Sequence, residues 1–384
     1  MPTRDVDVLL IGGGVASVRC ARTLRRRGFT GSILLVGEER SIPYNRPPLS
    51  KELLRGEAPV ELTWAEQPEW YPRQHVQLAL GVAVTELDAA AARARLADGT
   101  RVRFGQCLIA TGARPRVPPV PGAEHAILLR TAADSQEIHA RAAAGGRAVV
   151  IGGGFIGVEV AASLAAVGMR VTVLEMAPAL WGGAFGPALS DWASNVLAER
   201  DVSVRLGTAI TRLEPDAAWA GDERLDADML IAGVGVSPRV ELAQELKLDD
   251  GIVVDEQRRT SAPHVFAAGD VARVSGRRVE HWHAARAGGE AAAFGMLGLD
   301  PPPQRAPWVF SEFAGQQIDV VGWAPTFDET ISLHGGRLVA YLREGLVAQL
   351  AVLNGAVPVE AARALVEETP PPAALAGLTA AAAV

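Results

Sequence analysis

Glycine-rich turns occur twice in this sequence, each directly after an apolar run, and both have the spacing of a dinucleotide-binding turn. The first is centred on Gly12 and Gly14, and the second, about 140 residues later, on Gly152 and Gly154. Glycine at these positions allows a tight turn and lets backbone N–H groups approach a pyrophosphate at a helix N-terminus. Two such turns predict two nucleotides held face to face, as hydride transfer from a nicotinamide to a flavin requires.

Each turn is accompanied by a small residue at its third position and by an acid after the next apolar run. The small residues are Ser17 and Gly157, and the acids are Glu38 and Glu175. A small residue lets the helix pack closely on its strand, and the carboxylate can accept hydrogen bonds from ribose hydroxyls. Alone, a glycine turn could be a plain strand-to-helix connection, and either acid an exposed charge at a strand end. Two complete, matched units favour nucleotide binding.

The acid of the second unit also bears on the choice of nicotinamide cofactor. A carboxylate at Glu175 would repel the 2′-phosphate of NADPH, and no Arg or Lys occurs in residues 176–181. The sequence therefore favours NADH over NADPH at this turn.

The residues around both turns predict the strand–helix–strand units of an α/β fold with two Rossmann-like domains. Apolar runs at residues 6–11 and 32–36 flank a helix that ends near Arg27, and the same order of elements recurs over residues 147–174. A glycine pattern in this setting is a far more specific sign of nucleotide binding than the pattern alone.

Two stretches that cannot continue a strand or helix predict crossings between domains. One is the proline-rich segment 114–122 after a predicted strand at residues 101–110, and the other follows an apolar strand at residues 229–232. We expect three domains: a discontinuous FAD-binding domain (1–112 and 240–306), an inserted NAD-binding domain (113–239) and a C-terminal α+β domain (307–384).

Composition restricts the classes of protein that the chain can belong to. Hydrophobic residues make up 49% of its 384 residues, no apolar run reaches the roughly 18 residues that span a bilayer, and the N-terminus has no signal-peptide pattern. A net charge of −7 argues against nucleic acid as the main partner. The two cysteines, Cys20 and Cys107, are far apart in apolar segments, which predicts reduced, buried thiols and a cytoplasmic protein.

Metal chemistry and dithiol chemistry have no support in the sequence. His281 and His283 flank Trp282 without a Cys or acidic partner at ligand spacing, so we expect a loop-to-helix junction there and no metal. No Cys-x-x-Cys or Cys-x4-Cys pair occurs, so electrons from a flavin would leave directly for an acceptor.

Several further motifs give the chain a specific family resemblance, which extends to about residue 355. The segment Tyr-Asn-Arg-Pro-Pro-Leu-Ser-Lys at residues 44–51 resembles the flavin-proximal loop of the FAD-dependent ferredoxin reductases. That family includes putidaredoxin, rubredoxin and aromatic-dioxygenase ferredoxin reductases and extends to apoptosis-inducing-factor relatives. Matching motifs follow in the same order at residues 108–112, 129–131, 149–160, 265–270, 280–282 and 307–308.

The resemblance implies FAD and NADH as cofactors and assigns residues to them. Asp270 would accept hydrogen bonds from ribityl hydroxyls, although it could also be a helix cap or turn aspartate. A helix opening near residues 283–285 would direct its positive end at the flavin. The implied cofactor-binding residues are Gly12, Gly14, Ala16, Ser17, Glu38, Arg46, Lys51, Val84, Ala110, Thr111, Gly112, Arg130, Gly152, Gly154, Phe155, Ile156, Gly157, Glu159, Glu175, Gly235, Gly269, Asp270, Trp282 and Phe310.

Lys51 and Glu159 are the residues to which the matched loop and helix give a catalytic role. An ammonium beside the N5/O4 edge would stabilise reduced flavin, and Glu159 could pair with it across the nicotinamide pocket. A buried structural ion pair explains the same two residues equally well. No other residue has the pattern of an acid, base or nucleophile, because direct hydride transfer needs only alignment of the two rings.

One departure from the family lies in the C-terminal domain. Relatives usually have Pro-Trp-aromatic-Trp-Ser-Asp-Gln, whereas this chain has Phe310 for the inner Trp and Phe313 for the Gln. A phenyl ring keeps an aromatic stack but loses the indole N–H, so cofactor affinity or the electron acceptor could differ.

The resemblance implies an NADH-dependent FAD reductase that passes electrons singly to a 2Fe–2S or similar ferredoxin. That ferredoxin would serve a cytochrome P450 or a ring-hydroxylating dioxygenase. Alternatives are an NADH oxidase or quinone and small-acceptor reductase of the same fold, and an apoptosis-inducing-factor-like protein that binds in response to NADH. Candidate docking residues for an acidic ferredoxin are Arg277, Arg278, Arg286 and Arg305.

Overall fold

The computed structural model describes residues 3–378, which form two compact units. The first unit comprises the described chain up to Arg46 together with residues 60–114 and 237–304. The second comprises residues 47–59, residues 115–236 and the described chain from Arg305 onward. Two of the passages between the units lie at β7 (Ala113–Pro115) and β16 (Val236–Pro238), near the two predicted crossings.

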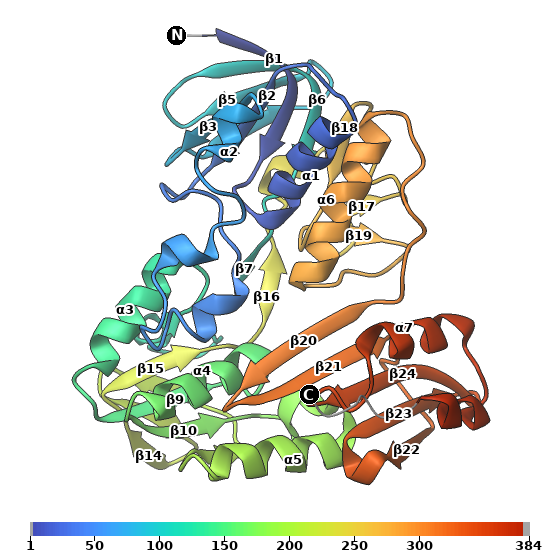
Figure 1. Ribbon diagram of the computed structural model, residues 1–384. Helices are drawn as coiled ribbons and strands as arrows, with labels where there is room; N and C mark the ends of the chain where they lie inside the picture. Colours follow the sequence, from blue (N-terminus) through green and yellow to red (C-terminus); the bar gives the residue numbers. More distant parts are fainter. Residues whose placement is uncertain (1–2, 379–384) are drawn as a thin grey trace. The chain divides into compact units, whose positions relative to one another are not determined.

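The first unit contains a seven-stranded sheet in the order β3-β2-β1-β6-β5-β4, with β18 paired to β6 (Figure 1). Five of these strands are parallel, and β4 and β5 add an antiparallel edge. Strand β2 and the last four residues of β1 are buried without interruption, which is typical of parallel strands covered on both faces. The strands are β1 (Thr3–Ile11), β2 (Ile33–Gly37), β3 (Val76–Leu80), β4 (Val84–Asp88), β5 (Arg93–Leu96), β6 (Arg101–Ile109) and β18 (Val265–Ala267).

Helices α1 (Val15–Arg26) and α6 (Trp282–Met296) pack side by side on this sheet (Figure 1). Their approach requires a glycine, since a Cβ at Gly289 would lie 2.1 Å from the carbonyl oxygen of Ala16. Short elements complete the first unit, namely α2 (Trp70–Arg73), β17 (Ile252–Val254) and β19 (Ala272–Val274).

The second unit contains a parallel five-stranded sheet in the order β11-β10-β9-β15-β8. Helix α4 is buried from Gly157 to Leu164. Three further short strands, which lie between β11 and β15 in the sequence, form a separate β-meander. The elements are β8 (Ile127–Leu128), α3 (Ala132–Ala142), β9 (Arg147–Ile151), α4 (Phe155–Ala166), β10 (Arg170–Leu174), α5 (Gly186–Ala198), β11 (Ser203–Arg205), β12 (Arg212–Glu214), β13 (Ala217–Ala220), β14 (Glu223–Asp226) and β15 (Met229–Ala232).

The C-terminal part of the second unit is an antiparallel sheet in the order β20-β21-β24-β23-β22, on which α7 packs (Figure 1). Phe313, Ile318 and Tyr341 share one hydrophobic cluster with residues of α4 and α5, so this sheet and the parallel five-stranded sheet have a common core. The elements are β20 (Trp308–Phe313), β21 (Gln316–Gly322), β22 (Glu329–Leu333), β23 (Leu338–Arg343), β24 (Leu346–Leu353) and α7 (Val359–Glu368).

Single turns of 3-10 helix connect these elements. They are η1 (Pro47–Ser50), η2 (Val60–Thr63), η3 (Ala123–His125), η4 (Leu180–Gly183), η5 (Glu241–Ala243), η6 (His334–Gly336) and η7 (Pro372–Gly377). The predicted α/β class is confirmed, whereas the division into three domains stays a prediction. Residues 47–59, which that division assigns to the FAD-binding domain, pack with the second unit.

A carboxylate is buried inside the C-terminal sheet. Asp319 has no exposed surface, and it accepts hydrogen bonds from Trp308 Nε1 (2.8 Å) and Gln317 Nε2 (2.7 Å). No ion-pair partner for it occurs among the described residues. Burial raises the pKa of the Asp319 carboxyl, an effect that the two hydrogen bonds oppose.

We expect Asp319→Asn to remove part of the pH dependence of stability. Because the folded-state pKa is raised, the wild-type carboxyl favours the folded state at low pH and loses that contribution as pH rises through its folded pKa. The unfolding temperature of the variant should therefore increase relative to wild type as the pH rises from about 4 toward 8.

Thermal unfolding at stepped pH measures this difference. Glu329→Gln is the matched control, because Glu329 is an exposed carboxylate in the same sheet. The prediction would be contradicted if the unfolding temperature of Asp319→Asn minus that of wild type stayed constant or fell with rising pH.

Candidate functional site

The first glycine turn is closed on one side and open on the other. Gly12 has a φ of +116°, and a Cβ there would lie 2.2 Å from the carbonyl oxygen of Ala110, so only glycine fits. Gly14 caps α1 without a side-chain hydrogen bond, and a Cβ there would meet nothing within 4 Å. The first turn of α1 has no acidic residue. The uncapped helix end and the free space beside Gly14 fit a pyrophosphate.

The second glycine turn has the same construction. Gly152 has a φ of +103°, and a Cβ there would lie 2.5 Å from the carbonyl oxygen of Gly233. Gly154 caps α4 without a side-chain hydrogen bond, and the nearest atom to a Cβ there would be 3.9 Å away. This helix end therefore fits a second pyrophosphate in the same way.

The two turns differ at their third position. A Cβ on Gly157 would lie 1.9 Å from the carbonyl oxygen of Gly152, so helix α4 cannot carry a larger residue there without moving. In α1 the equivalent Ser17 is fully buried, and its hydroxyl has no hydrogen-bond partner among the residues that the structure describes. The first unit thus has room for a Cβ that the second unit lacks.

Glu175 fixes the second turn through its carboxylate. Oε2 accepts a hydrogen bond from Gly153 N (2.6 Å), and Oε1 accepts one from Ala177 N (2.7 Å). A carboxylate has about four lone-pair positions, so both oxygens can accept further hydrogen bonds, for example from a ribose. The contact with Gly153 gives this acid a structural role that its position in the sequence did not reveal.

Glu38 reaches other predicted residues through Arg239, which the sequence analysis missed. Arg239 Nη1 donates to Glu38 Oε2 (2.7 Å), Arg239 N donates to Gly112 O (2.9 Å), and Thr111 Oγ1 donates to Arg239 O (2.7 Å). Glu38 is more than half exposed and lies just after β2. No local pattern marks Arg239, since it is about 200 residues from Glu38.

Lys51 and Glu159 form a buried ion pair within the second unit. Lys51 Nζ lies 2.8 Å from Glu159 Oε2, and the two side chains are only 7% and 5% exposed. Lys51 Nζ also donates to Pro47 O (3.0 Å), within the turn that the prolines form. The side chains are therefore paired as hypothesised, while their catalytic role stays a prediction.

Two serines complete the surroundings of the Glu159 carboxylate. Ser311 Oγ donates to Oε1 (2.7 Å), and Ser50 Oγ donates to Oε2 beside the Lys51 ammonium. Each serine is buried, and they come from β20 and η1. Neither serine was predicted as a site residue, although Ser50 directly precedes Lys51 in the predicted flavin-proximal loop.

The predicted flavin-contacting segments of the first unit have defined anchors. Helix α6 begins at Trp282, where His281 is the N-cap and accepts a hydrogen bond from His283 N (3.3 Å). Trp282 Nε1 donates to Asn45 Oδ1 (2.8 Å). The described residues contain no group of three or more His, Cys, Asp or Glu suited to a metal, and the histidines form the helix junction.

The predicted site residues divide between the two units. Lys51, Arg130 and Phe310 lie in the second unit with the second glycine turn, although the family resemblance implies contacts with FAD for Lys51 and Arg130. Arg130 N donates to Asp134 Oδ2 (2.9 Å) ahead of α3, and Phe310 is the cross-strand neighbour of Asp319. Those in the first unit are Gly12, Gly14, Ala16, Ser17, Glu38, Arg46, Val84, Ala110, Thr111, Gly112, Gly269, Asp270 and Trp282.

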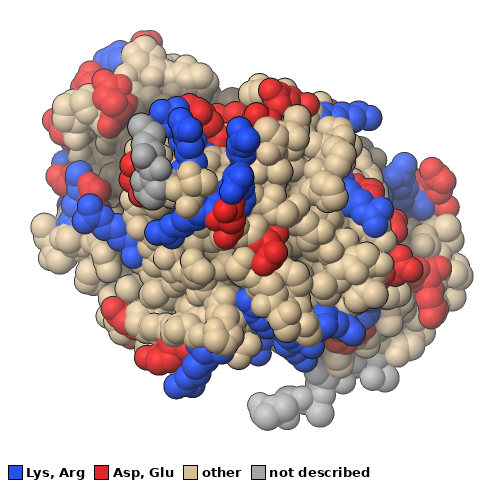
Figure 2. Space-filling model, turned by 90° about the horizontal axis from the view of Figure 1, so that it is seen from above, with Lys and Arg blue, Asp and Glu red and all other residues tan. Residues whose placement is uncertain are grey.

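Two of the proposed docking arginines are engaged elsewhere. Arg278 was predicted as a docking residue for a ferredoxin, which is wrong: its side chain is only 7% exposed and is paired with Asp250 and Glu280. Arg305 is paired with Glu360 and Glu367. On the face drawn in Figure 2, basic and acidic side chains alternate without a large patch of one sign.

Comparison with known proteins places the chain in a family. The family described as "Pyridine nucleotide-disulphide oxidoreductase" matches residues 6–289. The chain belongs to this family. The disulphide of the family name has no counterpart here, since Cys20 and Cys107 are both buried and unpaired, and burial raises the pKa of each thiol.

Individual relatives of this oxidoreductase are ferredoxin reductases, which confirms the predicted resemblance. It is 34% identical to putidaredoxin reductase CamA of Pseudomonas putida over 349 residues, covering 85% of this chain and 82% of the relative. It is 35% identical to the anthranilate 1,2-dioxygenase system ferredoxin–NAD(+) reductase component of Burkholderia cepacia, covering 82% and 81% of the two chains.

A solved structure has the same fold throughout. The putidaredoxin reductase chain in a covalent complex with putidaredoxin matches with a TM-score of 0.90 and 32% identity, over 95% of this oxidoreductase and 94% of that chain. Among residues 3–378, none of the helices is long and apolar enough to cross a bilayer.

Alanine at the third position of the two glycine turns should change the stability of the protein in opposite directions. We expect Ser17→Ala to stabilise the protein by about 1 kcal/mol, because it removes a buried hydroxyl without a partner. We expect Gly157→Ala to destabilise it by about 1–3 kcal/mol, because the added methyl meets a carbonyl oxygen. Thermal unfolding followed by circular dichroism compares them. Equal unfolding temperatures of the two variants would refute the steric difference between the turns.

Proposed function

We propose that this oxidoreductase is an NADH-dependent FAD reductase that passes electrons one at a time to a 2Fe–2S or similar ferredoxin. The ferredoxin would serve a cytochrome P450 or a ring-hydroxylating dioxygenase, since the names of similar reductases include a CYP system and dioxygenase systems. The observation that carries the proposal is the pair of glycine turns with free space beside Gly14 and Gly154. The two buried, unpaired cysteines support a reducing compartment, which we infer to be the cytoplasm.

FAD fits the residues of the first unit. The turn at Gly14 would hold its pyrophosphate, Glu38 its adenosine ribose, and Asp270 its ribityl hydroxyls. The N-terminus of α6, capped by His281, would direct its positive end toward the flavin ring. Bound FAD would supply the chemistry that no side chain has: it accepts two electrons together and releases them singly.

NADH fits the second unit better than NADPH does. Glu175 directly follows β10, where its carboxylate would accept hydrogen bonds from ribose hydroxyls and would repel a 2′-phosphate. Arg205, at the end of the neighbouring strand β11, donates two hydrogen bonds (2.8 and 2.5 Å) to Glu223. A cation close to Glu175 is thus committed to another acid, which leaves the 2′-phosphate without an obvious partner.

The Lys51–Glu159 pair would align the nicotinamide ring. Glu159 is in the second turn of α4, five residues after Gly154, so it lies on the helix whose N-terminus would hold the NADH pyrophosphate. Its carboxylate is held by Lys51, Ser50 and Ser311, which fixes its rotamer. A fixed carboxylate and ammonium could orient a ring for direct hydride transfer without moving a proton.

The purified protein should contain FAD, and NADH should bleach its flavin faster than NADPH does. Steady-state reduction of cytochrome c should be appreciable only when a ferredoxin is added, since the flavin delivers electrons to an iron–sulfur protein. A panel of ferredoxins assayed at fixed NADH gives the measurement.

Other outcomes of this assay distinguish the alternatives. Equal rates without ferredoxin, with oxygen or quinone as acceptor, would contradict the proposal and favour a small-acceptor reductase. Very slow flavin reduction with a long-lived charge-transfer band would favour a protein that binds in response to NADH.

Lys51→Met and Glu159→Gln should each lower the rate of flavin reduction by roughly tenfold or more, because the ring would lose its alignment. Lys51→Met should also destabilise the protein by about 3–5 kcal/mol, since it leaves the buried Glu159 carboxylate without its cation. Stopped-flow absorbance and thermal unfolding measure the two effects.

The double variant Lys51→Met/Glu159→Gln separates alignment from stability. It removes both charges, so we expect stability to recover while flavin reduction stays slow. Recovery of the rate together with stability would instead identify a purely structural ion pair.

A further inference from the structure

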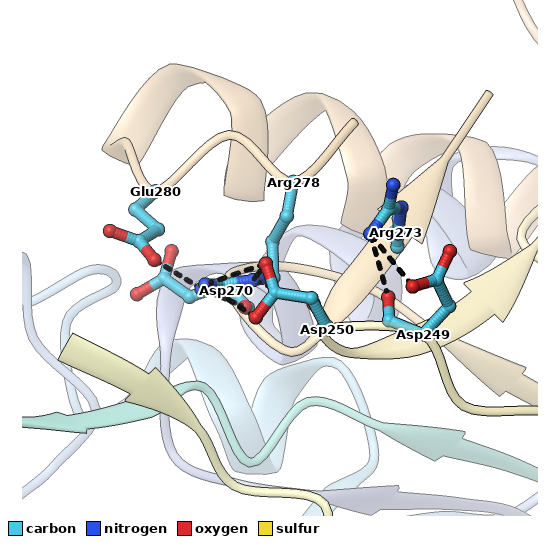
Figure 3. Close-up of polar contacts among 6 residues, drawn as sticks. All are labelled: Asp249, Asp250, Asp270, Arg273, Arg278 and Glu280. Atoms are coloured by element: carbon cyan, nitrogen blue, oxygen red, sulfur yellow. Dashed lines mark hydrogen bonds and ion pairs between the residues drawn. The ribbon is translucent and has the colours of Figure 1, made fainter. Parts of the chain in front are cut away.

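Three segments of the first unit meet at one arginine. They are the loop that carries Asp249 and Asp250, the turn at Asp270 before β19, and the segment at Glu280 just before α6. Figure 3 shows the Arg278 side chain pointing into the group formed by Asp250, Asp270 and Glu280, whereas Arg273 points to Asp249. Asp270 and Trp282 are residues to which the proposed function gives flavin contacts.

Arg278 bonds to all three segments from a buried position. Nε donates to Asp250 O (2.8 Å), Nη2 donates to both Asp250 carboxylate oxygens (3.3 and 3.2 Å), and Nη1 donates to Asp270 O (3.4 Å) and to Glu280 Oε1. Its side chain is 7% exposed. The aliphatic part packs on Gly251, where a Cβ would lie 3.1 Å from Arg278 Cδ.

A planar guanidinium is the side chain that this arrangement requires. It carries five N–H donors in a fixed fork, so one group can bond in several directions at once and two carboxylates can balance its charge. A lysine has one flexible ammonium and cannot reach three segments in the same geometry. The arginine therefore acts as a rigid link between segments that are separate in sequence.

Arg273 provides a natural comparison within the same cluster. Its Nη1 donates to Asp249 O (3.1 Å) and lies 3.1 Å from Asp249 Oδ1, so it holds the same loop as Arg278. Both of these contacts are with Asp249, however, and neither reaches Asp270 or Glu280. An effect that comes only from holding the loop should thus be common to both arginines.

We propose that Arg278 is a positioning residue for FAD, one that fixes Asp270 and the start of α6 relative to each other. The inference rests on the proposed function. Arg278 itself would not touch the flavin: it acts through the carbonyl of Asp270 and the carboxylate of Glu280. Both contacts lie within two residues of a predicted flavin contact, so loss of the link would let the ribityl-binding carboxylate and the N-terminus of α6 move independently.

The test titrates FAD into the deflavinated protein and follows quenching of flavin fluorescence. We expect Arg278→Gln to raise the FAD Kd by about tenfold or more, since hydrogen bonds to charged groups are lost at two segments. Arg273→Gln should leave the Kd within about twofold of wild type, while it lowers the unfolding temperature of the flavin-free protein as Arg278→Gln does. Arg278→Lys should also raise the Kd, because charge alone does not restore the fork.

The outcomes separate this inference from the proposed function. If wild-type protein binds no FAD, the proposed function fails. If wild type binds FAD and Arg278→Gln raises the Kd no more than Arg273→Gln does, Arg278 only holds the loop and the inference is overturned. Should Arg278→Gln fail to fold, Arg278→Lys decides: a wild-type Kd and a wild-type visible spectrum of the bound flavin would overturn the inference.

Discussion

The buried carboxylate of Glu159 is the constraint on which the second unit depends. A carboxylate that is 5% exposed is tolerated only when a cation and hydrogen-bond donors surround it. Lys51 supplies the cation, and Ser50 and Ser311 supply the donors. These partners come from η1, from the residue directly after it and from β20, so satisfying one charge brings two distant stretches of sequence onto α4.

This requirement explains why residues 47–59 pack with the second unit. Beyond Lys51, Ser135 Oγ donates to Leu49 O (2.7 Å), Ser163 Oγ donates to Ser50 O (2.7 Å), and His139 Nδ1 lies 2.9 Å from Leu54 O. The segment therefore has its polar groups satisfied by α3 and α4. A division of domains drawn along the sequence could not place it there, since its covalent neighbours on both sides belong to the first unit.

Features that depend on residues close together in the sequence could be predicted, whereas features that depend on distant partners could not. The glycine turns and the strand Met229–Ala232 depend on neighbouring residues, and the structure has both. Strand β20, the Arg239 link to Glu38, the serines at Glu159 and the burial of Arg278 depend on partners far along the chain. Arg278 was misjudged for that reason, because Asp250 lies 28 residues before it and nothing local indicates the pairing.

Strand β20 has one buried face, which the fold constrains, and one half-buried face, where a substitution is tolerated more easily. Side chains alternate along a strand, so Ser311 and Phe313 point to one face and Trp308 and Phe310 to the other. The first pair is buried, with Ser311 on Glu159 and Phe313 in the core cluster, whereas the second pair is half-buried. On that second face, Asp319 accepts hydrogen bonds from the Trp308 indole and the Gln317 amide. Its hydrogen bonding therefore does not depend on an indole N–H at position 310, its cross-strand neighbour. Phe in place of Trp at position 310 can therefore alter an aromatic contact without disturbing Glu159, the buried carboxylate on the other face of β20.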